Sequence, residues 1–269
     1  MRIGNKEFDL AHHCYVMGIL NVTPDSFSDG GRWNSIDAAL RHTEEMIGEG
    51  CDILDIGGES TRPGYSRISD EEEIGRVAPI IEAVKTRFDI PISLDTYKSR
   101  VALAGIRAGA DLINDIWGCK SDPAMAGVIA SSGAACCLMH NRPEINYTDY
   151  LKDVLDDLRE CVRIAKEAGV GDDRIILDPG LGFAKTYENN MTLMKHLELL
   201  KDLGYPILLG ASRKSMIGRT LDLPASERLE GTLVTTVMGV MKGASFVRVH
   251  DIRANKRAIA MTEGILQFD

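Results

Sequence analysis

Polar and charged side chains recur along this chain at the ends of short apolar runs. They are Asn21, Asp55, Asp95, Asn114, His140, Asp178, Ser212, Arg248 and His250. An unpaired polar group inside a strand costs free energy, so each of them alone is readily explained as a satisfied structural residue. Because they recur at the same end of run after run, we interpret them together as the lining of one polar pocket.

The carboxylates and the amide in this set suit a flat heterocycle. Asp95, Asn114 and Asp178 offer carboxylate and amide oxygens together with an amide NH2 group. These groups complement the edge of an amino-pyrimidinone ring. We therefore expect the three side chains to bind a base-like ring.

A second group of residues suits an oxyanion. Arg248 and His250 are two positions apart in an apolar run, so in a strand both side chains point to the same face. Asn21, Thr61 and Arg62 add donors and positive charge, and the whole group favours a diphosphate. The alternative for each arginine alone is a solvated surface charge.

A third group indicates a second, aromatic substrate. Lys214 and Ser215 lie in the stretch ASRKSMIG, and Phe27 and Phe183 lie in two other long connections. Lysine in a loop is most often solvated, and the Pro, Asp, Ser and Gly residues around Phe27 make turns regardless of function. The connection that contains Phe27 is too long to be only a turn, which favours a functional loop.

Eight repeated strand–helix units must position these side chains. The expected strands are 15–22, 51–58, 91–97, 111–118, 134–140, 174–180, 206–212 and 246–251, and the expected helices are 35–49, 70–88, 99–108, 123–132, 149–168, 187–203, 226–243 and 252–266. Several helices follow Ser or Asp suited to N-capping, and glycines at 50, 109, 133, 169 and 204 suit their ends. Eight units in series favour a closed α/β barrel, a (β/α)8 TIM barrel, over a doubly wound open sheet.

The bulk properties indicate one ordinary globular unit. The chain has 269 residues, 44% of them hydrophobic, and we expect a single barrel domain over 1–269. A formal net charge of −9 argues against a general nucleic-acid or membrane binder. The six cysteines form no CxxC pair, and no signal segment or membrane span is evident, so we expect a cytoplasmic protein.

Seven motifs in order resemble those of the dihydropteroate synthases. They are NVTPDSFSDGG (21–31), GGESTRPG (57–64), SLDT (93–96), NDIWG (114–118), DPGLGF (178–183), GASRKSMIG (210–218) and VRVHD (247–251). Any one of these strings is weak, whereas seven in the correct order on the correct strands are specific. The resemblance implies a pterin-binding barrel enzyme of folate synthesis, a transferase that condenses 6-hydroxymethyl-7,8-dihydropterin diphosphate with p-aminobenzoate and is a sulfonamide target.

The resemblance also implies roles for single residues. Asp95, Asn114, Asp178 and Lys214 would hold the dihydropterin ring, Thr61, Arg248 and His250 would bind its diphosphate, and Asn21 would reach the Mg2+ that the diphosphate carries. Phe27, Arg62, Pro63, Phe183, Lys214 and Ser215 would shape the p-aminobenzoate site. Asp95, Lys214, Arg248 and His250 would act in catalysis, in which the diphosphate departs first and the amine then attacks.

Three places depart from the family pattern. The stretch LMHNRPEINY (138–147) stands where a Met- and Gly-containing stretch is expected, and Ala184 stands where a glycine is common. Tyr65 is larger than the usual small residue after ESTRPG. His140 and the 141–147 loop therefore receive no role from the sequence.

Two other functions remain as alternatives at this point. A pterin-binding barrel that passes a methyl group to a corrinoid would share the Asp and Asn residues, but it has no diphosphate and leaves Arg62, Lys214, Arg248 and His250 unexplained. A catalytically silent paralogue that binds pterin without turnover uses the same residues. Turnover separates the second alternative from a synthase.

The stretch 231–241, GTLVTTVMGVM, contains no charged residue over about three helical turns. A barrel helix normally presents a polar outer face, so we expect part of this one to be covered. Together with the resemblance, this favours a two-fold homodimer through the helices after the sixth to eighth strands. Thr235 and Thr236 are the positions that we expect to point outward.

Overall fold

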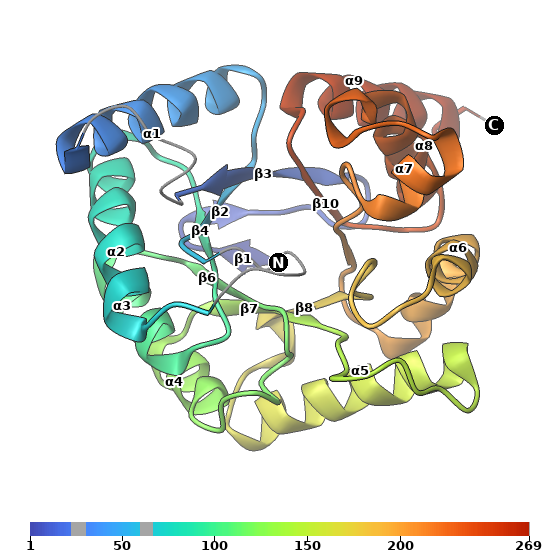
Figure 1. Cartoon of the computed structure of the whole chain (residues 1–269), viewed down its shortest axis with the longest axis horizontal. Coiled ribbons are helices and arrows are strands. Elements are labelled where there is room, and N and C mark those ends of the chain that lie inside the picture. Colours follow the sequence, from blue (N-terminus) through green and yellow to red (C-terminus); the bar gives the residue numbers. More distant parts are fainter. Residues whose placement is uncertain (23–30, 60–66, 269) are drawn as a thin grey trace.

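The computed structural model describes residues 1–22, 31–59 and 67–268, with the backbone alone for 31–35. Eight parallel strands run side by side in the order β8-β7-β6-β5-β4-β3-β10-β9. Their bounds are β3 Tyr15–Asn21, β4 Ile53–Gly57, β5 Ile92–Asp95, β6 Leu112–Asp115, β7 Ala135–Met139, β8 Ile175–Asp178, β9 Leu208–Leu209 and β10 Phe246–Val249. A parallel bridge between Leu177 and Ile207 joins the first and last strands of this order. The sheet therefore closes into the expected (β/α)8 barrel, which Figure 1 shows inside a ring of helices.

The eight expected helices are present around the strands. Their bounds are α1 Gly31–Gly48, α2 Asp70–Arg87, α3 Ser99–Ala108, α4 Met125–Ser132, α5 Tyr150–Glu167, α6 Tyr187–Lys195, α8 Leu229–Met241 and α9 Ile252–Leu266. Ser69 and Asp149 cap α2 and α5 by accepting hydrogen bonds from the backbone N–H groups of Glu72 and Lys152. Gly109 ends α3 at φ +116°, where an L side chain would be strained.

Two helical features differ from the expectation. The expected helix 187–203 is divided at His196 into α6 and a 3-10 helix, Leu197–Leu203. The connection after β9 contains a short additional helix, α7 (Ser215–Leu221), which begins directly after Lys214. The sequence did not predict α7, because a helix of only two turns has too few apolar residues to show a periodic pattern.

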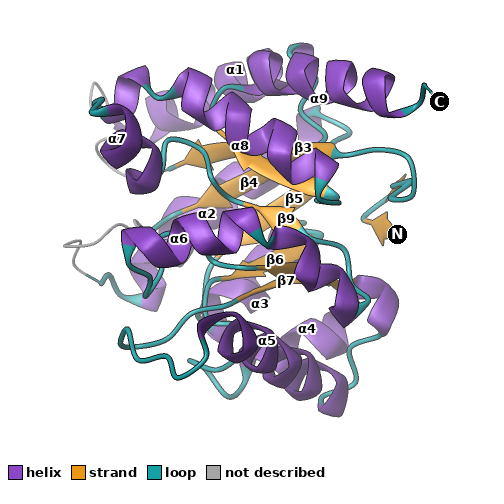
Figure 2. Ribbon diagram, turned by 90° about the vertical axis from the view of Figure 1, so that its right-hand side faces the viewer, coloured by secondary structure: helices purple, strands orange, loops and turns teal. Residues whose placement is uncertain are grey.

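An N-terminal hairpin, also absent from the expectation, closes one end of the barrel. Strands β1 (Arg2–Ile3) and β2 (Lys6–Glu7) pair antiparallel, and Ile3 and Phe8 are fully buried. Their side chains join a cluster inside the barrel that includes Met17 and Phe246. Figure 2 shows the N-terminus and α7 at opposite ends of the barrel.

The strand register brings the predicted pocket residues together at the other end. Asn21 is level with Gly57, Gly57 with Asp95, and Asp95 with Asn114, so four neighbouring strands end in one row. Met139 pairs with Asp178 farther round the barrel. Parallel strands all present their carboxyl ends at the same rim, where barrel enzymes build their active sites.

Thr235 and Thr236 do not point outward, which corrects the expectation for α8. They are 6% and 2% exposed, and the Thr236 hydroxyl donates to Asn255 Oδ1 on α9 at 2.7 Å. Their hydroxyl groups are satisfied within the chain, so this face of the helix packs inward. The exposed face carries Val234 and Met241 instead, at 58% and 62% exposure.

Within the described part of the chain, none of the helices has both the length and the apolar character needed to cross a membrane.

Candidate active site

Three side chains from separate strands form an ion-pair cluster at the barrel mouth. Arg248 on β10 donates through Nε to Asp55 Oδ2 at 2.6 Å and through a terminal nitrogen to Asp95 Oδ2 at 2.8 Å. Ser93 donates to the other oxygen of Asp55 at 2.5 Å. The guanidinium thus joins β4, β5 and β10, and it fixes the direction of the Asp95 carboxylate.

One oxygen of Asp95 is left for a ligand. Its Oδ1 atom is buried and, among the described residues, has no hydrogen-bond partner, unlike Oδ2. Buried polar atoms are nearly always paired in folded proteins, so an unpaired one at a barrel mouth indicates where a ligand donates. Burial raises the pKa of Asp95 to about 7, against the opposing charge of Arg248.

Asp178 and Lys214 lie on the opposite side of the same pocket. Asp178 Oδ1 accepts from the backbone N–H of Gly180 at 2.7 Å, and burial raises its pKa. Burial lowers the pKa of Lys214 to about 8, although the charges of Asp178 and Asp95 oppose this shift. Lys214 Nζ lies 4.4 Å from the centre of the Phe183 ring, a cation–π contact.

The loop after β9 orients the residues that follow β10. Ser212 Oγ lies 2.9 Å from His250 Nδ1 and accepts from the His250 backbone N–H at 3.2 Å. Arg213 makes two hydrogen bonds to Asp251, at 3.1 and 2.7 Å. His250, directly after β10 (Phe246–Val249), is therefore held against the loop after β9.

The remaining predicted residues fall into three groups. Asn114 is buried at the end of β6, Asn21 is exposed at the end of β3, and Ser215 is exposed at the start of α7. Phe27, Thr61, Arg62, Pro63 and Tyr65 lie outside the described residues. Among residues 1–22, 31–59 and 67–268, no group of three or more His, Cys, Asp or Glu side chains is arranged to hold a metal ion.

Lys98, which receives no role from the sequence, links Glu59 to Ile68. Its buried ammonium donates to Glu59 Oε2 at 2.7 Å and to the Ile68 carbonyl at 2.9 Å. A third hydrogen bond, at 2.7 Å, goes to Glu73 on α2. Lys98 follows SLDTY by one residue, but its partners are up to 39 positions away, so only the fold reveals its role.

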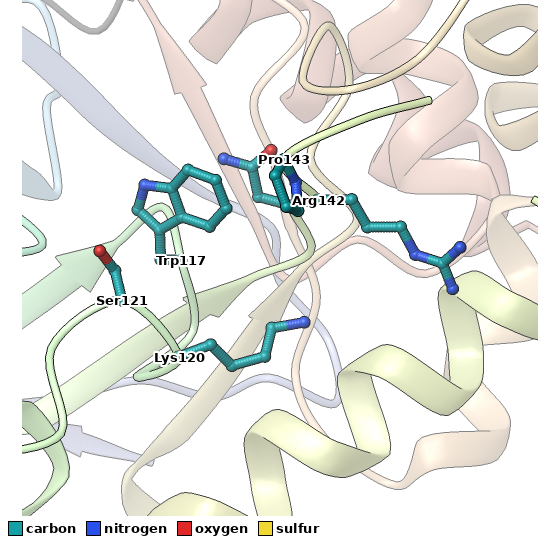
Figure 3. Close-up of a pocket in the computed structure, with 6 residues that line it drawn as sticks. Trp117, Lys120, Ser121, Arg142 and Pro143 are labelled. Carbon is teal, nitrogen blue, oxygen red and sulfur yellow. The ribbon is translucent and has the colours of Figure 1, made fainter. Parts of the chain in front are cut away.

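A cavity of about 320 Å3 lies between the loops after β6 and β7. Its lining residues are Trp117, Lys120, Ser121, Asn141, Arg142 and Pro143. Figure 3 shows the Trp117 ring and the Lys120 side chain on one side and Arg142 on the other. The sequence reading gave none of these residues a role.

Comparisons with known proteins place this chain among the members of one family. A family model described as pterin binding enzyme matches residues 17–250. The dihydropteroate synthase of Clostridium beijerinckii is 60% identical over 99% of this chain and 100% of its own length, and that of Bacillus subtilis is 56% identical over 93% and 88%.

Solved structures of dihydropteroate synthases are also similar to this chain. A dihydropteroate synthase from Clostridium difficile, crystallised in the presence of pteroic acid, superposes with a TM-score of 0.95 at 48% identity, over 97% of this chain and 100% of the other. The Xanthomonas albilineans dihydropteroate synthase with 4-aminobenzoic acid gives 0.91 at 38% identity, over 96% and 94%.

Proposed function

Because this chain belongs to the pterin binding enzymes, as a member of the dihydropteroate synthase family, we propose that it condenses 6-hydroxymethyl-7,8-dihydropterin diphosphate with p-aminobenzoate. The products are 7,8-dihydropteroate, a folate precursor, and diphosphate. The observation that carries this proposal is the unpaired, buried Asp95 Oδ1 atom, which lies at the mouth beside Arg248 and opposite Asp178 and Lys214. A pterin ring has N–H groups that can donate to this oxygen.

The pterin side of the site uses fixed charges. Asp95, Asn114, Asp178 and Lys214 hold the ring, and Arg248 and His250, with Thr61, bind the diphosphate. Arg248 donates to Asp55 and Asp95 through Nε and Nη2, and its other terminal nitrogen would donate to the diphosphate. Such preorganised charges are effective in a site from which water is excluded.

The second substrate lies against the loops after β8 and β9. Phe183, Lys214 and Ser215 form its described boundary, and Phe27, Arg62 and Pro63 complete it. Lys214 lies over the Phe183 ring and interacts with Asp178, so it contacts both substrates. Sulfonamides, which resemble p-aminobenzoate in shape and charge, compete for this second pocket; a Yersinia pestis relative has been solved in a sulfonamide drug complex.

The reaction proceeds by departure of the diphosphate before the amine attacks. The methylene C–O bond breaks, and the electron-rich pterin delocalises the resulting cation, which the Asp95 carboxylate stabilises. Arg248 and His250 stabilise the leaving anion. The aniline nitrogen is unprotonated at neutral pH, so it attacks the methylene carbon without a general base and then releases a proton.

The donors present fit a magnesium ion carried by the diphosphate. Mg2+ commonly keeps several waters and binds through few protein oxygens plus substrate phosphates. Asn21 offers one amide oxygen at the exposed end of β3, and the described residues contain no cluster of three acidic or His/Cys ligands. Mg2+ bound there would neutralise charge on the departing diphosphate.

Removal of divalent cations is expected to abolish turnover, because the leaving group then departs without charge neutralisation. The measurement is the initial rate of diphosphate release in excess EDTA, followed by titration with Mg2+. Full activity in EDTA contradicts the assignment of Asn21 as a metal ligand. Restoration of the rate by added Mg2+ controls for irreversible damage by the chelator.

We also propose that the protein is a cytoplasmic homodimer. Val234 and Met241 are exposed on α8, and the half-buried Met238 lies between them at the i, i+4, i+7 spacing of one helix face. Met261 and Ile265 form a similar exposed stripe on α9. Figures 1 and 2 place these two helices side by side. The six cysteines are free and buried, which suits a reducing compartment.

A coupled assay for diphosphate release tests the function. With a divalent cation and both substrates present, diphosphate release is expected in a one-to-one ratio with dihydropteroate. Tight binding of the pterin diphosphate without product would instead indicate a catalytically silent relative.

A further inference from the structure

A buried hydrogen-bonded chain connects β7 to the loop 179–186. His140 at the end of β7 is fully buried, and its ring lies between Asp157 Oδ2 at 3.0 Å and Lys185 Nζ at 2.8 Å. Burial lowers the pKa of His140 to about 4, so the ring is neutral at neutral pH. Lys185 Nζ donates a hydrogen bond to Nδ1 of the neutral ring, so the ring proton lies on Nε2 and Nε2–H donates to Asp157.

Lys185 carries this chain to the site. Its Nζ atom also donates to the Phe183 carbonyl at 3.0 Å. It lies close to Gly180, where a methyl group would come within 3.3 Å of Nζ and would collide with the His140 carbonyl. The ammonium thus occupies the inside of the turn that follows Asp178.

Tyr147 holds the next carbonyl of the same turn. Its hydroxyl donates to the Ala184 carbonyl at 2.8 Å, and its ring stacks on His140 with the centres 6.1 Å apart. The Arg142 guanidinium covers the Tyr147 ring at 4.6 Å and donates to Asp157 at 2.6 Å. Two successive carbonyls, at 183 and 184, are therefore fixed from the β7–α5 side.

These contacts determine where the Phe183 ring lies in the active site. Phe183, whose carbonyl Lys185 holds, is the ring under Lys214 Nζ. A shift of the 183–184 backbone would move this ring and the ammonium above it. Asp95 and Asn114 belong to other strands, β5 and β6, and would stay in place.

We propose that Tyr147 and Lys185, aligned by His140, are positioning residues that place Phe183 for the second, arylamine substrate. The inference rests on the proposed function, and it gives the divergent stretch 138–147 a role in specificity for the aromatic carboxylate. None of the three needs to touch a substrate, because each acts through the backbone of the 178–186 turn.

Two variants test the inference by separating affinity from stability. Tyr147→Phe removes only the hydroxyl that holds the Ala184 carbonyl, and Lys185→Met removes the hydrogen bonds to Phe183 and His140 at nearly constant volume. Each is expected to raise KM for p-aminobenzoate about three- to tenfold, the factor for one lost hydrogen bond. The dissociation constant of dihydropterin diphosphate should change less than KM does.

Thermal unfolding distinguishes positioning from a merely structural role. Lys185→Met leaves the buried His140 Nδ1 atom and the Phe183 carbonyl without this donor, so it should lower the melting temperature. Tyr147→Phe removes one hydrogen bond of a half-buried residue and should lower it less, so a raised KM in Tyr147→Phe near the wild-type melting temperature indicates positioning. Tyr205→Phe and Lys152→Met are matched controls, because their polar groups bind Asp172 and Asp156 at the surface.

The outcomes are distinct. A raised KM for p-aminobenzoate in both variants, with the controls unchanged, supports the inference. An unchanged KM in both variants of an active enzyme overturns it, and so does an equal loss of affinity for both substrates. Wild-type protein that binds both substrates but forms no product contradicts the proposed function instead.

Discussion

Asp95 and Lys214 carry opposite charges in one buried pocket, and burial moves the pKa of each toward neutrality. The pKa of Asp95 rises to about 7 and that of Lys214 falls to about 8. Neighbouring charges oppose both shifts, with Arg248 acting on Asp95 and Asp178 on Lys214. The fraction of molecules in which both groups are charged is therefore highest between the two values.

This pair predicts a bell-shaped dependence of activity on pH. The value of kcat/KM for dihydropterin diphosphate should rise near pH 7, as Asp95 ionises, and fall near pH 8, as Lys214 loses its proton. The measurement is kcat/KM from about pH 6 to about pH 9 at constant ionic strength. A flat profile over this range contradicts the assigned charge states, and Lys214→Arg should move the upper limb to higher pH, since arginine stays protonated.

The sequence predicted the ring-binding group because carboxylate and amide side chains are known from residue types alone. It did not predict which residues those side chains contact. Arg248 and Asp55 are 193 positions apart, and Lys185 and His140 are 45 apart, so their pairing exists only in the folded barrel. Which strand-end polar groups bind a ligand and which bind one another therefore requires coordinates.

At the scale of elements, the alternation of apolar runs and amphipathic stretches predicted every barrel strand and its helix. The limits of strands were predicted less well, because apolar residues continue past the paired segment. The run 206–212 contains a strand of only two residues, Leu208–Leu209. The hairpin β1–β2 is too short to show any alternation, and its burial depends on the barrel that it closes.

The turn after β8 contains a strained residue at a place where the family pattern has glycine. Ala184 has φ +43°, in the left-handed region that L residues other than glycine rarely adopt. The left-handed conformation costs about 1–2 kcal/mol for such a residue, whereas glycine costs about 0.4–1 kcal/mol through the entropy of the unfolded chain.

Ala184→Gly should therefore raise the free energy of unfolding by about 0.5–1 kcal/mol. Ala168→Gly is the matched control, because Ala168 has φ −79° at the end of α5 and should lose about 0.5–1 kcal/mol. Urea unfolding of both variants measures the difference. If Ala184→Gly lowers the free energy of unfolding as much as Ala168→Gly does, Ala184 is not strained.

At the scale of the whole molecule, the apolar face of α8 and α9 predicts assembly. Val234→Glu would place a charge at the centre of this face, and burial of that charge across a two-fold contact is unfavourable. Sedimentation equilibrium should then give a mass near 29.5 kDa for the variant and twice that for the wild type. The control Ile145→Glu alters an exposed residue of the β7–α5 loop and should stay dimeric. A wild-type mass of one chain rejects the dimer.

The sequence indicated that α8 is covered but selected the wrong face of it. Composition shows that the stretch 231–241 carries no charge, but not which way each residue points. Threonine is polar, which suggested exposure for Thr235 and Thr236, whereas both hydroxyls find partners inside the fold. Small polar residues can be satisfied within a helix interface, so polarity alone does not determine the outer face.

The central claim is that one site at the barrel mouth binds two substrates that meet at Lys214. The most direct test is steady-state kinetics of Lys214→Ala with each substrate varied in turn, beside the exposed control Lys195→Ala. Because Lys214 lies between Asp178 and Phe183, the variant should raise KM for both dihydropterin diphosphate and p-aminobenzoate, and the control should match the wild type. A change in KM for one substrate alone, or for neither, would contradict the account.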